Sequence, residues 1–247
     1  FCFISYGFTV YKALLFRVVE PNDQALVAFE SLFTGGTPPH QLITRWAAQH
    51  PWLIILGDNI YYLLFDHMFV VSAFLTGLGR RGLRLQYLSA LGLCYLLGGV
   101  SYYCFAGLGP VFSDPQTYAF LRKLPLTSNW FHNVLARNTM AARDGSLKVI
   151  QSYEFIACVP SLHIAHELVM LWYARSSRVF FGLSLLFTGI TLLAVVFLGW
   201  HYPVDSLAGL ALAALAVTLA WWQRDRLLPR WLEQFLSEAE ADAATDG

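Results

Sequence analysis

The chain has 247 residues, of which 57% are hydrophobic and only 13% are charged. A water-soluble domain of this length carries more charge, so the composition excludes an ordinary soluble fold and indicates a polytopic membrane protein. The formal net charge is zero, which gives no reason to expect a nucleic-acid partner. Because the first residue is a phenylalanine inside an apolar run, we expect the sequence to begin within a longer protein.

Apolar stretches that approach the length needed to cross a bilayer, about 20 residues, recur along the chain. They predict an all-α integral membrane protein, a bundle of six transmembrane helices at residues 1–19, 52–77, 86–108, 155–174, 179–199 and 204–222. Lys12 and Arg17 weaken the first of these spans. The spans and their connections form one predicted membrane domain at 1–230, followed by an acidic, alanine-rich tail at 231–247 that is expected to be flexible on the cytoplasmic side.

Arginine residues in short connections predict the orientation in the membrane. These connections follow the second, fourth and sixth spans and contain Arg80, Arg81, Arg84, Arg175, Arg178, Arg224, Arg226 and Arg230. Alternation of the spans puts all three connections on one side, which the positive-inside rule makes cytoplasmic. The starts of the fourth and sixth spans then face the non-cytoplasmic side, which is periplasmic, extracellular or lumenal.

A histidine and a carboxylate stand at the start of the sixth span, in the sequence Gly-Trp-His-Tyr-Pro-Val-Asp at 199–205. Pro203 suits the first turn of a helix, and a spacing of four residues lets His201 and Asp205 share one face. A carboxylate that accepts one imidazole N–H leaves the other nitrogen as a nucleophile or base. The alternative is an interfacial histidine beside an aspartate that the helix dipole favours.

The fourth span begins with a similar pattern, Val-Pro-Ser-Leu-His at 159–163. Pro160 and Ser161 suit a helix start, which puts His163 in the first turn, where backbone N–H groups favour an anion. Ser161 can add a hydroxyl donor for a phosphate, and His163 can act as the general acid for a leaving oxygen. Ionisable groups in membrane spans are costly and usually functional, so three of them at one membrane face indicate an active site.

The two motifs, Pro-Ser-Leu-His at 160–163 and His-Tyr-Pro-Val-Asp at 201–205, resemble those of the type-2 phosphatidic acid phosphatase superfamily. The chain is most similar to the branch that contains the inositol phosphorylceramide synthases. This resemblance implies a six-helix membrane core. It also implies that His201 is the nucleophile, that Asp205 orients it, and that His163 is the acid for the leaving group.

The sequence departs from the family pattern where the phosphate is usually held. Typical members carry Lys, six residues and Arg-Pro ahead of the first motif, and no such string occurs here. They also carry Ser-Arg ahead of the second histidine, where this chain has Ala194 and Val195. The connection at 110–155 offers other cations, namely Arg122, Lys123, Arg137, Arg143 and Lys148. We predict that Arg137 and Arg143 bind the phosphate because a planar guanidinium suits it, the alternative being ordinary solvated charge.

The second span carries further polar residues. Asp58 lies in its outer half and is predicted to bind a polar head group, or alternatively to pair with a buried cation such as Arg17. Asp66 and His67 lie deeper and are predicted to form a structural pair. His166 is interpreted as a packing or supporting residue. No metal or cofactor is expected, because the spacing of the histidines in the fourth span lacks a third ligand.

Three further features concern packing and access. Four aromatic residues are predicted to lie in the aromatic belt at the membrane interface, namely Trp200, Tyr202, Trp221 and Trp222. Because the 110–155 connection mixes aromatic and basic residues, we expect it to form short interfacial helices over the site. A stripe of small residues on the sixth span predicts close helix packing at Gly209, Ala213, Ala216 and Ala220.

The sequence therefore predicts a membrane enzyme that moves a phosphoryl group, free or substituted, from a lipid-linked phosphate to a lipid alcohol through a phosphohistidine. Hydrolysis of a lipid or polyprenyl phosphate is the alternative within this class. A non-catalytic transporter or assembly subunit is the alternative from another class. The expected partners are the lipid phosphate, a lipid alcohol and the surrounding membrane lipids, and the oligomeric state is not specified by the sequence.

Overall fold

The computed structural model describes residues 2–15, 18–78, 81–146 and 159–227, and within them the chain forms helices and no strand. The first half contains α1 (Cys2–Leu15), α2 (Asp23–Ser31), α3 (Pro39–Ala47), α4 (Pro51–Tyr62), α5 (Leu64–Gly77) and α6 (Arg81–Cys104). The second half contains α7 (Pro110–Ser113), the 3-10 helix η1 (Ala119–Lys123), α8 (Thr127–Asp144), α9 (Leu162–Ala174), α10 (Arg178–Phe197) and α11 (Pro203–Leu227). The predicted all-α class is thus confirmed for the described residues, and the predicted tail at 231–247 lies outside them.

Within the described residues, three helices are long and apolar enough to cross a membrane, at Gly82–Cys104, Arg178–Phe197 and Pro203–Gln223. The pair α4 and α5, bent by 54°, makes a fourth if it is counted as one broken span. The helices at the other two predicted spans are shorter, since α1 has 14 residues and α9 has 13. At 1.5 Å per residue, α9 is only about 20 Å long. Three to four candidate spans are therefore confirmed, and the number six stays a prediction.

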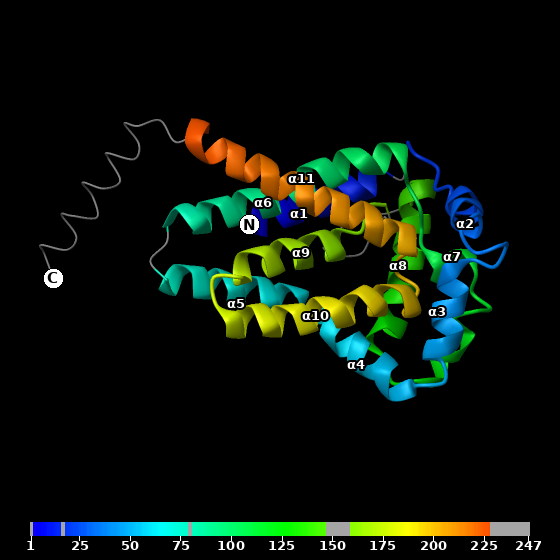
Figure 1. Ribbon diagram of the computed structural model, residues 1–247. Coiled ribbons are helices and arrows are strands. Elements are labelled where there is room, and N and C mark those ends of the chain that lie inside the picture. The colour runs from blue at the N-terminus through cyan, green and yellow to red at the C-terminus, as the bar shows by residue number, and fades with distance from the viewer. Residues whose placement is uncertain (1, 16–17, 79–80, 147–158, 228–247) are drawn as a thin grey trace, which may run out of the picture.

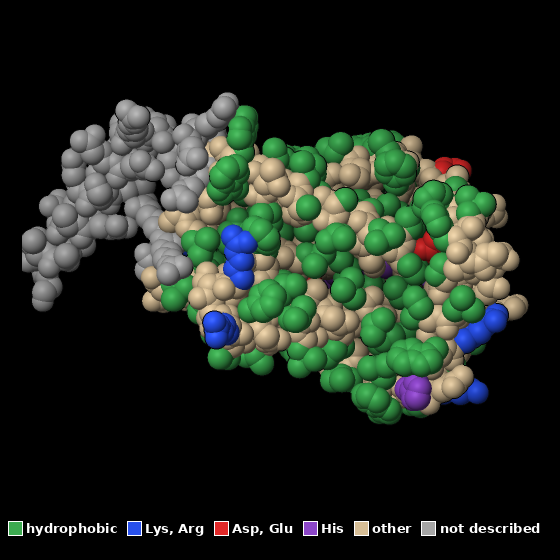
Figure 2. Space-filling view, in the orientation of Figure 1, with side chains coloured by type: hydrophobic (Ala, Val, Ile, Leu, Met, Phe, Trp, Pro, Cys, Tyr) green, Lys and Arg blue, Asp and Glu red, His purple; other side chains and the backbone are tan. Residues whose placement is uncertain are grey.

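Helix α9 lies in the middle of the bundle (Figure 1). It packs against α6 and α11 on one side and against α5 and α10 on the other. Its apolar residues Ile164, Val169 and Met170 are fully buried in these contacts. Hydrophobic side chains also cover much of the visible face of the bundle, and the few charged side chains on that face lie toward its two ends (Figure 2). A lipid bilayer matches such a surface, because charge is costly only within its hydrocarbon core.

The two ends of the bundle differ in what they carry (Figure 1). Helices α2, α3, α7 and α8 gather at the end where α9 and α11 begin. The opposite end holds the start of α6 with Arg84, and the turn from α9 to α10 with Arg175 and Arg178. The predicted basic connections are therefore separated from the predicted site by the length of the bundle. The side chains of the other arginines used in the orientation argument lie outside the described residues.

The small-residue stripe of α11 lies in close helix packing, as predicted. Ala213, Ala216 and Ala220 are buried. At Gly209 the approach is so close that a Cβ atom would lie 2.6 Å from the carbonyl oxygen of Ser161. Small residues allow helix backbones to approach in this way. Gly209 therefore allows the starts of α9 and α11 to lie this close together.

The connection that begins at residue 110 folds into α7, η1 and α8, of which α8 has 18 residues. Asp58 of α4 fixes the start of α8, because its two oxygens accept hydrogen bonds from the backbone N–H groups of Thr127 at 2.7 Å and Ser128 at 3.0 Å. The Ser128 hydroxyl donates to the same carboxylate at 2.5 Å. A carboxylate at a helix start pairs N–H groups that have no partner within the helix. The expected helices are present, α8 being longer than expected, and their contact with a bilayer stays a prediction.

Candidate active site

His201 lies in the tight connection between α10 and α11. Gly199 ends α10 at a φ of +80°, a left-handed conformation that glycine adopts readily. A Cβ atom at this position would also lie 2.6 Å from the side chain of Val111. The backbone N–H of His201 donates to the carbonyl oxygen of Val195 at 2.9 Å, and Pro203 then begins α11 as predicted. The position of His201 is therefore set by the backbone on both sides of it.

The side chains of His201 and Asp205 meet, as the four-residue spacing predicts. Nδ1 of His201 lies 3.3 Å from Oδ2 of Asp205, and the backbone N–H of Tyr202 donates to the same oxygen at 2.8 Å. Asp205 is 0% exposed and His201 is 5% exposed. The carboxylate favours the tautomer with its proton on Nδ1, which leaves Nε2 unprotonated. A histidine nucleophile requires this arrangement.

Ser161 and His163 open α9, also as predicted. The Ser161 side chain caps the helix by accepting a hydrogen bond from the backbone N–H of Ile164 at 3.4 Å. Its hydroxyl can still donate a proton to a ligand. The backbone N–H of Ser161 donates to the carbonyl oxygen of Asp205 at 3.0 Å. This bond ties the start of α9 directly to the start of α11.

The two histidines face each other across a short gap. Their ring centroids are 6.1 Å apart, and their planes make an angle of 59°. His163 stacks on Tyr61 at a centroid distance of 4.2 Å, and its Nδ1 lies 3.4 Å from the Tyr61 hydroxyl. Tyr61 is in turn parallel to the indole of Trp200. The structure therefore brings together the three predicted catalytic residues, while their roles stay predictions.

Helices α2 and α3 contribute to this site, which sequence reasoning missed. Glu30 accepts a hydrogen bond from the backbone N–H of Val204 at 2.7 Å, in the first turn of α11. Nδ1 of His40 lies 3.3 Å from the other oxygen of Glu30. Asp23 accepts from the hydroxyl of Tyr202 at 3.0 Å. Residues 20–51 thus hold the segment that links His201 to Asp205, and no motif marks them in the sequence.

The expectation that Trp200 and Tyr202 lie in an interfacial aromatic belt is wrong. Trp200 is 7% exposed and Tyr202 is 0% exposed. The Trp200 ring packs on His132 at a centroid distance of 4.2 Å, and its Nε1 donates to the Ser128 hydroxyl at 3.3 Å. Tyr202 shares a 2.6 Å hydrogen bond with Ser113 in addition to its bond with Asp23. Helices α2, α7 and α8 cover both aromatic side chains, so these side chains lie inside the protein and line the site.

The predicted phosphate-binding arginines are not among the described contacts of the two histidines. Arg137 is exposed on α8, and the side chain of Arg143 lies outside the described residues. The positions at which family members usually carry Ser-Arg are fully buried, since Ala194 and Val195 are both 0% exposed. A Cβ atom on Gly57 of α4 would lie 3.1 Å from the Cβ of Ala194. An arginine has no room at this crossing of α4 and α10.

Lys12 is a cation that sequence reasoning treated only as a weakness of the first span. Its ammonium group lies 5.4 Å from the centroid of the Phe8 ring, and Phe8 packs on Tyr102 at 5.8 Å. The Tyr102 hydroxyl donates to the carbonyl oxygen of Pro160 at 3.2 Å, immediately before the α9 cap. A lysine within an apolar helix is the signal that could have found it.

Asp66 and His67 do not form the predicted pair. Asp66 is exposed on α5, whereas Nδ1 of His67 lies 3.0 Å from Oε2 of Glu167 and its Nε2 lies 3.0 Å from the Ser184 hydroxyl. His166 is buried against the Tyr95 ring, in agreement with a packing role. The described residues contain no group of three or more His, Cys, Asp or Glu side chains that could hold a metal ion. His67, Glu167 and Ser184 form a polar cluster that joins α5, α9 and α10. This cluster is separate from the site.

The comparison with known families agrees with the geometry. A model of the PAP2 superfamily matches residues 24–219, a range that extends from α2 into α11 and includes His163, His201 and Asp205. No curated protein and no solved structure matches the chain. The family match covers well over half of the sequence, including both helix starts that form the site. The chain therefore belongs to the PAP2 superfamily.

Proposed function

We propose that this protein transfers a phosphoryl group, free or substituted, from a lipid-linked phosphate to a lipid alcohol, in the manner of inositol phosphorylceramide synthases. Membership of the PAP2 superfamily supports phosphatase or phosphotransferase chemistry. The proposal rests on one observation, the arrangement of His201, Asp205 and His163. Nδ1 of His201 lies 3.3 Å from Oδ2 of Asp205, and the ring of His163 faces that of His201 at 6.1 Å between centroids. Two histidines at this separation can contact one phosphoryl group.

The reaction proceeds in two displacements at phosphorus. Nε2 of His201 attacks phosphorus, the bond to the leaving alcohol oxygen breaks, and His163 gives its proton to that oxygen. The Nδ1 proton stays on His201 and is donated to Asp205, whose negative charge balances the positive charge on the phosphorylated ring. In the second step His163 takes the proton of the acceptor alcohol, whose oxygen attacks phosphorus and releases His201.

Positive groups around the phosphate complete the site. Lys12 and the backbone N–H groups at the start of α9 stabilise the charge on the phosphate oxygens, with the Ser161 hydroxyl as a further donor. Arg137 and Arg143 of α8 act as additional cations that attract the anionic lipid. Asp58 acts indirectly, because it holds the first turn of α8. Any contact that Asp58 makes with a head group would be made at the start of α8.

The burial of the site supports transfer over hydrolysis. His201 is 5% exposed and Asp205 is 0% exposed, so water has little access to the proposed nucleophile. The two acids of the second span, which would favour a transporter if they lined a buried pathway, do not form one. Asp58 holds the start of α8, and Asp66 is exposed on α5.

The proposed placement is a six-helix membrane core with the site on the non-cytoplasmic side. Arg84, Arg175 and Arg178 lie at the end of the bundle remote from the histidines, which supports this orientation. The short helix α9 is enclosed by four neighbouring helices, so its polar residues need not contact lipid. Labelling of single introduced cysteines from either side of sealed vesicles tests this placement.

Purified protein with radiolabelled lipid phosphates, with and without a lipid alcohol, tests the proposed reaction. We expect the label to appear in a new lipid only when the alcohol is present, and to appear transiently on the protein as an acid-labile phosphohistidine. Release of water-soluble phosphate at the same rate with or without the alcohol would replace transfer by hydrolysis. No turnover by the natural protein, or unchanged turnover by His201→Ala, would exclude both reactions.

A further inference from the structure

His40 and Thr44 are two polar side chains of α3 to which the proposed mechanism gives no role. Both are 0% exposed, so neither contacts solvent. They are separated by about one helical turn and therefore lie on the same face of α3. Helix α3 packs against α10 and lies at the end of the bundle where α11 begins (Figure 1). The hydrogen bonds of this polar face lead to the connection between α10 and α11, which carries His201.

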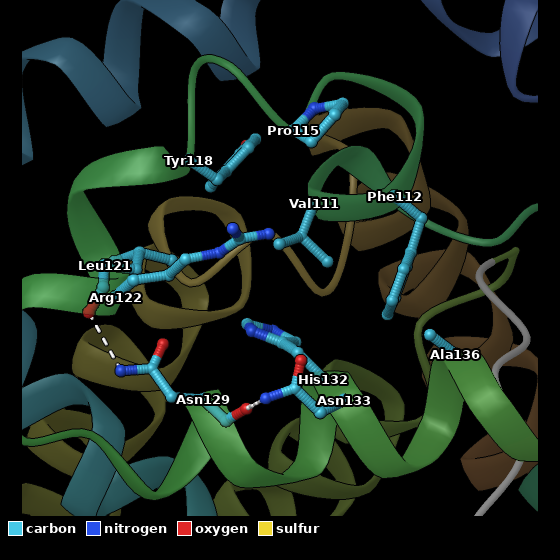
Figure 3. Close-up of a pocket in the computed structure, with 10 residues that line it drawn as sticks. All are labelled: Val111, Phe112, Pro115, Tyr118, Leu121, Arg122, Asn129, His132, Asn133 and Ala136. Atoms are coloured by element: carbon cyan, nitrogen blue, oxygen red, sulfur yellow. Dashed lines mark hydrogen bonds between the residues drawn. The ribbon is translucent and has the colours of Figure 1, made fainter.

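Thr44 supports the backbone on the N-terminal side of His201. Its hydroxyl donates to the Tyr118 hydroxyl at 3.2 Å, and the Tyr118 hydroxyl donates to the carbonyl oxygen of Val196 at 3.1 Å. The Tyr118 ring lies against Gly199, where a Cβ atom would be 2.9 Å from it. On another side Tyr118 lines a cavity of about 560 Å³ between α7, η1 and α8 (Figure 3). Because packing does not close that side, we expect the orientation of Tyr118 to depend on its hydrogen bonds.

His40 supports the backbone on the C-terminal side of His201. Its Nδ1 lies 3.3 Å from Oε2 of Glu30, and it carries the proton because a carboxylate oxygen only accepts. The other oxygen of Glu30 accepts from the backbone N–H of Val204 at 2.7 Å. The His40 ring also packs on the ring of Tyr202 at a centroid distance of 5.2 Å and an angle of 82°. His40 therefore contacts the residue after His201 directly and the first turn of α11 through Glu30.

The pair of Glu30 and His40 contributes little to its own helices. Glu30 lies in the last turn of α2, where the helix dipole disfavours a carboxylate. Nε2 of His40 is buried and has no hydrogen-bond partner among the described residues, which costs stability. Apolar side chains of similar volume often stabilise such a buried position at least as well as a polar pair. The geometry that the pair specifies therefore explains it better than stability does.

We infer that the polar face of α3 positions His201, because it holds the connection between α10 and α11 at two points. Thr44 fixes Val196 and His40 fixes Val204, each through one intermediate side chain. Both act through the backbone, as positioning residues, and not on the substrate. A displacement of about 1 Å at a reacting group can lower a rate about 10²-fold. The role of His201 as nucleophile rests on the proposed function, whereas the support of its ring by α3 does not.

Two pairs of variants of the full chain test the two points of support. Thr44→Val removes the hydroxyl at nearly the same side-chain size, and Thr44→Ser keeps it. His40→Leu removes the donor to Glu30, and His40→Asn keeps an N–H close to the place of Nδ1. The matched control is Thr191→Val, which removes a buried hydroxyl of α10 that has no hydrogen-bond partner among the described residues.

Rapid-quench labelling with a lipid phosphate that carries a nitrophenol leaving group isolates attack by His201, since this leaving group needs no protonation. We expect Thr44→Val and His40→Leu each to slow labelling about tenfold at saturating lipid, with the half-saturating concentration unchanged. Thr44→Ser and His40→Asn should keep most of the rate, and Thr191→Val should keep all of it. If His40→Leu does not fold, the Thr44 pair decides the test.

Nuclear magnetic resonance of protein containing isotope-labelled histidine gives a readout that needs no turnover. The signals of His201 are identified by their absence in His201→Ala. In the natural protein we expect the tautomer with its proton on Nδ1, which Asp205 favours. In Thr44→Val and His40→Leu we expect a mixture of the two tautomers, because the ring is no longer held beside the carboxylate.

Unchanged labelling and an unchanged His201 tautomer in Thr44→Val and His40→Leu would overturn the inference, even if both variants melt at a lower temperature. Equal losses in Thr44→Ser and His40→Asn would also overturn it, since packing and not the hydrogen bonds would then be responsible. Mixed tautomers in the two variants, together with no labelling of the natural protein, would contradict the proposed function alone and support the positioning role.

Discussion

The starts of α9 and α11 hold their histidines in different ways. His201 is fixed by hydrogen bonds, from its backbone N–H to Val195 and from its ring to Asp205. Glu30 also holds the first turn of α11. His163 is held by a ring stacked on Tyr61, with a single 3.4 Å contact between its Nδ1 and the hydroxyl. His163 is also partly exposed, whereas His201 is buried.

This difference matches the two roles in the proposed reaction. A nucleophile must present one nitrogen in a fixed tautomer and at a fixed position. An acid that later serves as a base must lose and regain a proton. A partly exposed and less rigidly held side chain suits this role. We therefore expect loss of the groups that hold His201 to cost more activity than loss of those that hold His163. The predictions below follow in order of decreasing effect.

The largest effect is expected for His201→Ala, which removes the nucleophile. Turnover should fall by about 10⁴-fold or more, as for other catalytic residues that act as a unit. The protein should also fail to acquire label from a radiolabelled lipid phosphate. Retention of a phosphorylated histidine in this variant would show that the roles of His201 and His163 are exchanged.

His163→Ala should lower turnover by about 10²–10⁴-fold, the usual contribution of a general acid. Unlike His201→Ala, this variant should still form the phosphohistidine when the substrate carries an activated leaving group such as nitrophenol, since that group needs no protonation. Rapid-quench measurement of the labelled protein follows this step. If the activated substrate does not restore labelling, His163 has a role other than proton donation.

Lys12→Gln should raise KM and lower turnover together, by about 10–100-fold in kcat/KM, because a charged hydrogen bond to the phosphate contributes about 1.5–3 kcal/mol. Lys12→Arg keeps the charge and should recover much of the loss. Steady-state kinetics with one lipid phosphate at varied concentration separates the two constants. An equal loss in both variants would mean that Lys12 acts through the packing of α1 and not through its charge.

Glu30→Ala should lower the rate of phosphohistidine formation by about tenfold, because the unpaired N–H of Val204 loosens the first turn of α11 at a cost of about 1–3 kcal/mol. Glu30→Gln is the matched control, since its amide oxygen can still accept from Val204 and should preserve the rate. A thermal melt of each variant accompanies the kinetics. A lowered melting temperature with an unchanged rate would show that Glu30 supports the fold only.

The smallest effect is expected for Tyr61→Phe, which keeps the ring that stacks on His163 and removes the 3.4 Å contact with its Nδ1. Turnover should fall by only about 2- to 5-fold, the effect of one weak hydrogen bond. A loss larger than that of Glu30→Ala would reverse the comparison and make His163 the more tightly positioned histidine. The measurement is the steady-state rate of the two variants side by side.

The sequence alone was sufficient for features that depend on one helix. The pairing of His201 with Asp205, the cap at Ser161 and the small-residue stripe of α11 all follow from the period of 3.6 residues and from rules for helix ends. The same reasoning located both helix starts that carry the site. These features could be predicted because the atoms that interact are within one or two turns of each other.

Contacts between distant segments were decided by the tertiary structure. Glu30 and Val204 are 174 residues apart, and their bond exists only because α2 folds over the start of α11. The partner of His67 is Glu167 on α9 and not the adjacent Asp66, since neighbouring residues on a helix point in different directions. The position of Lys12 likewise depends on how several helices pack, and no local periodicity contains that information.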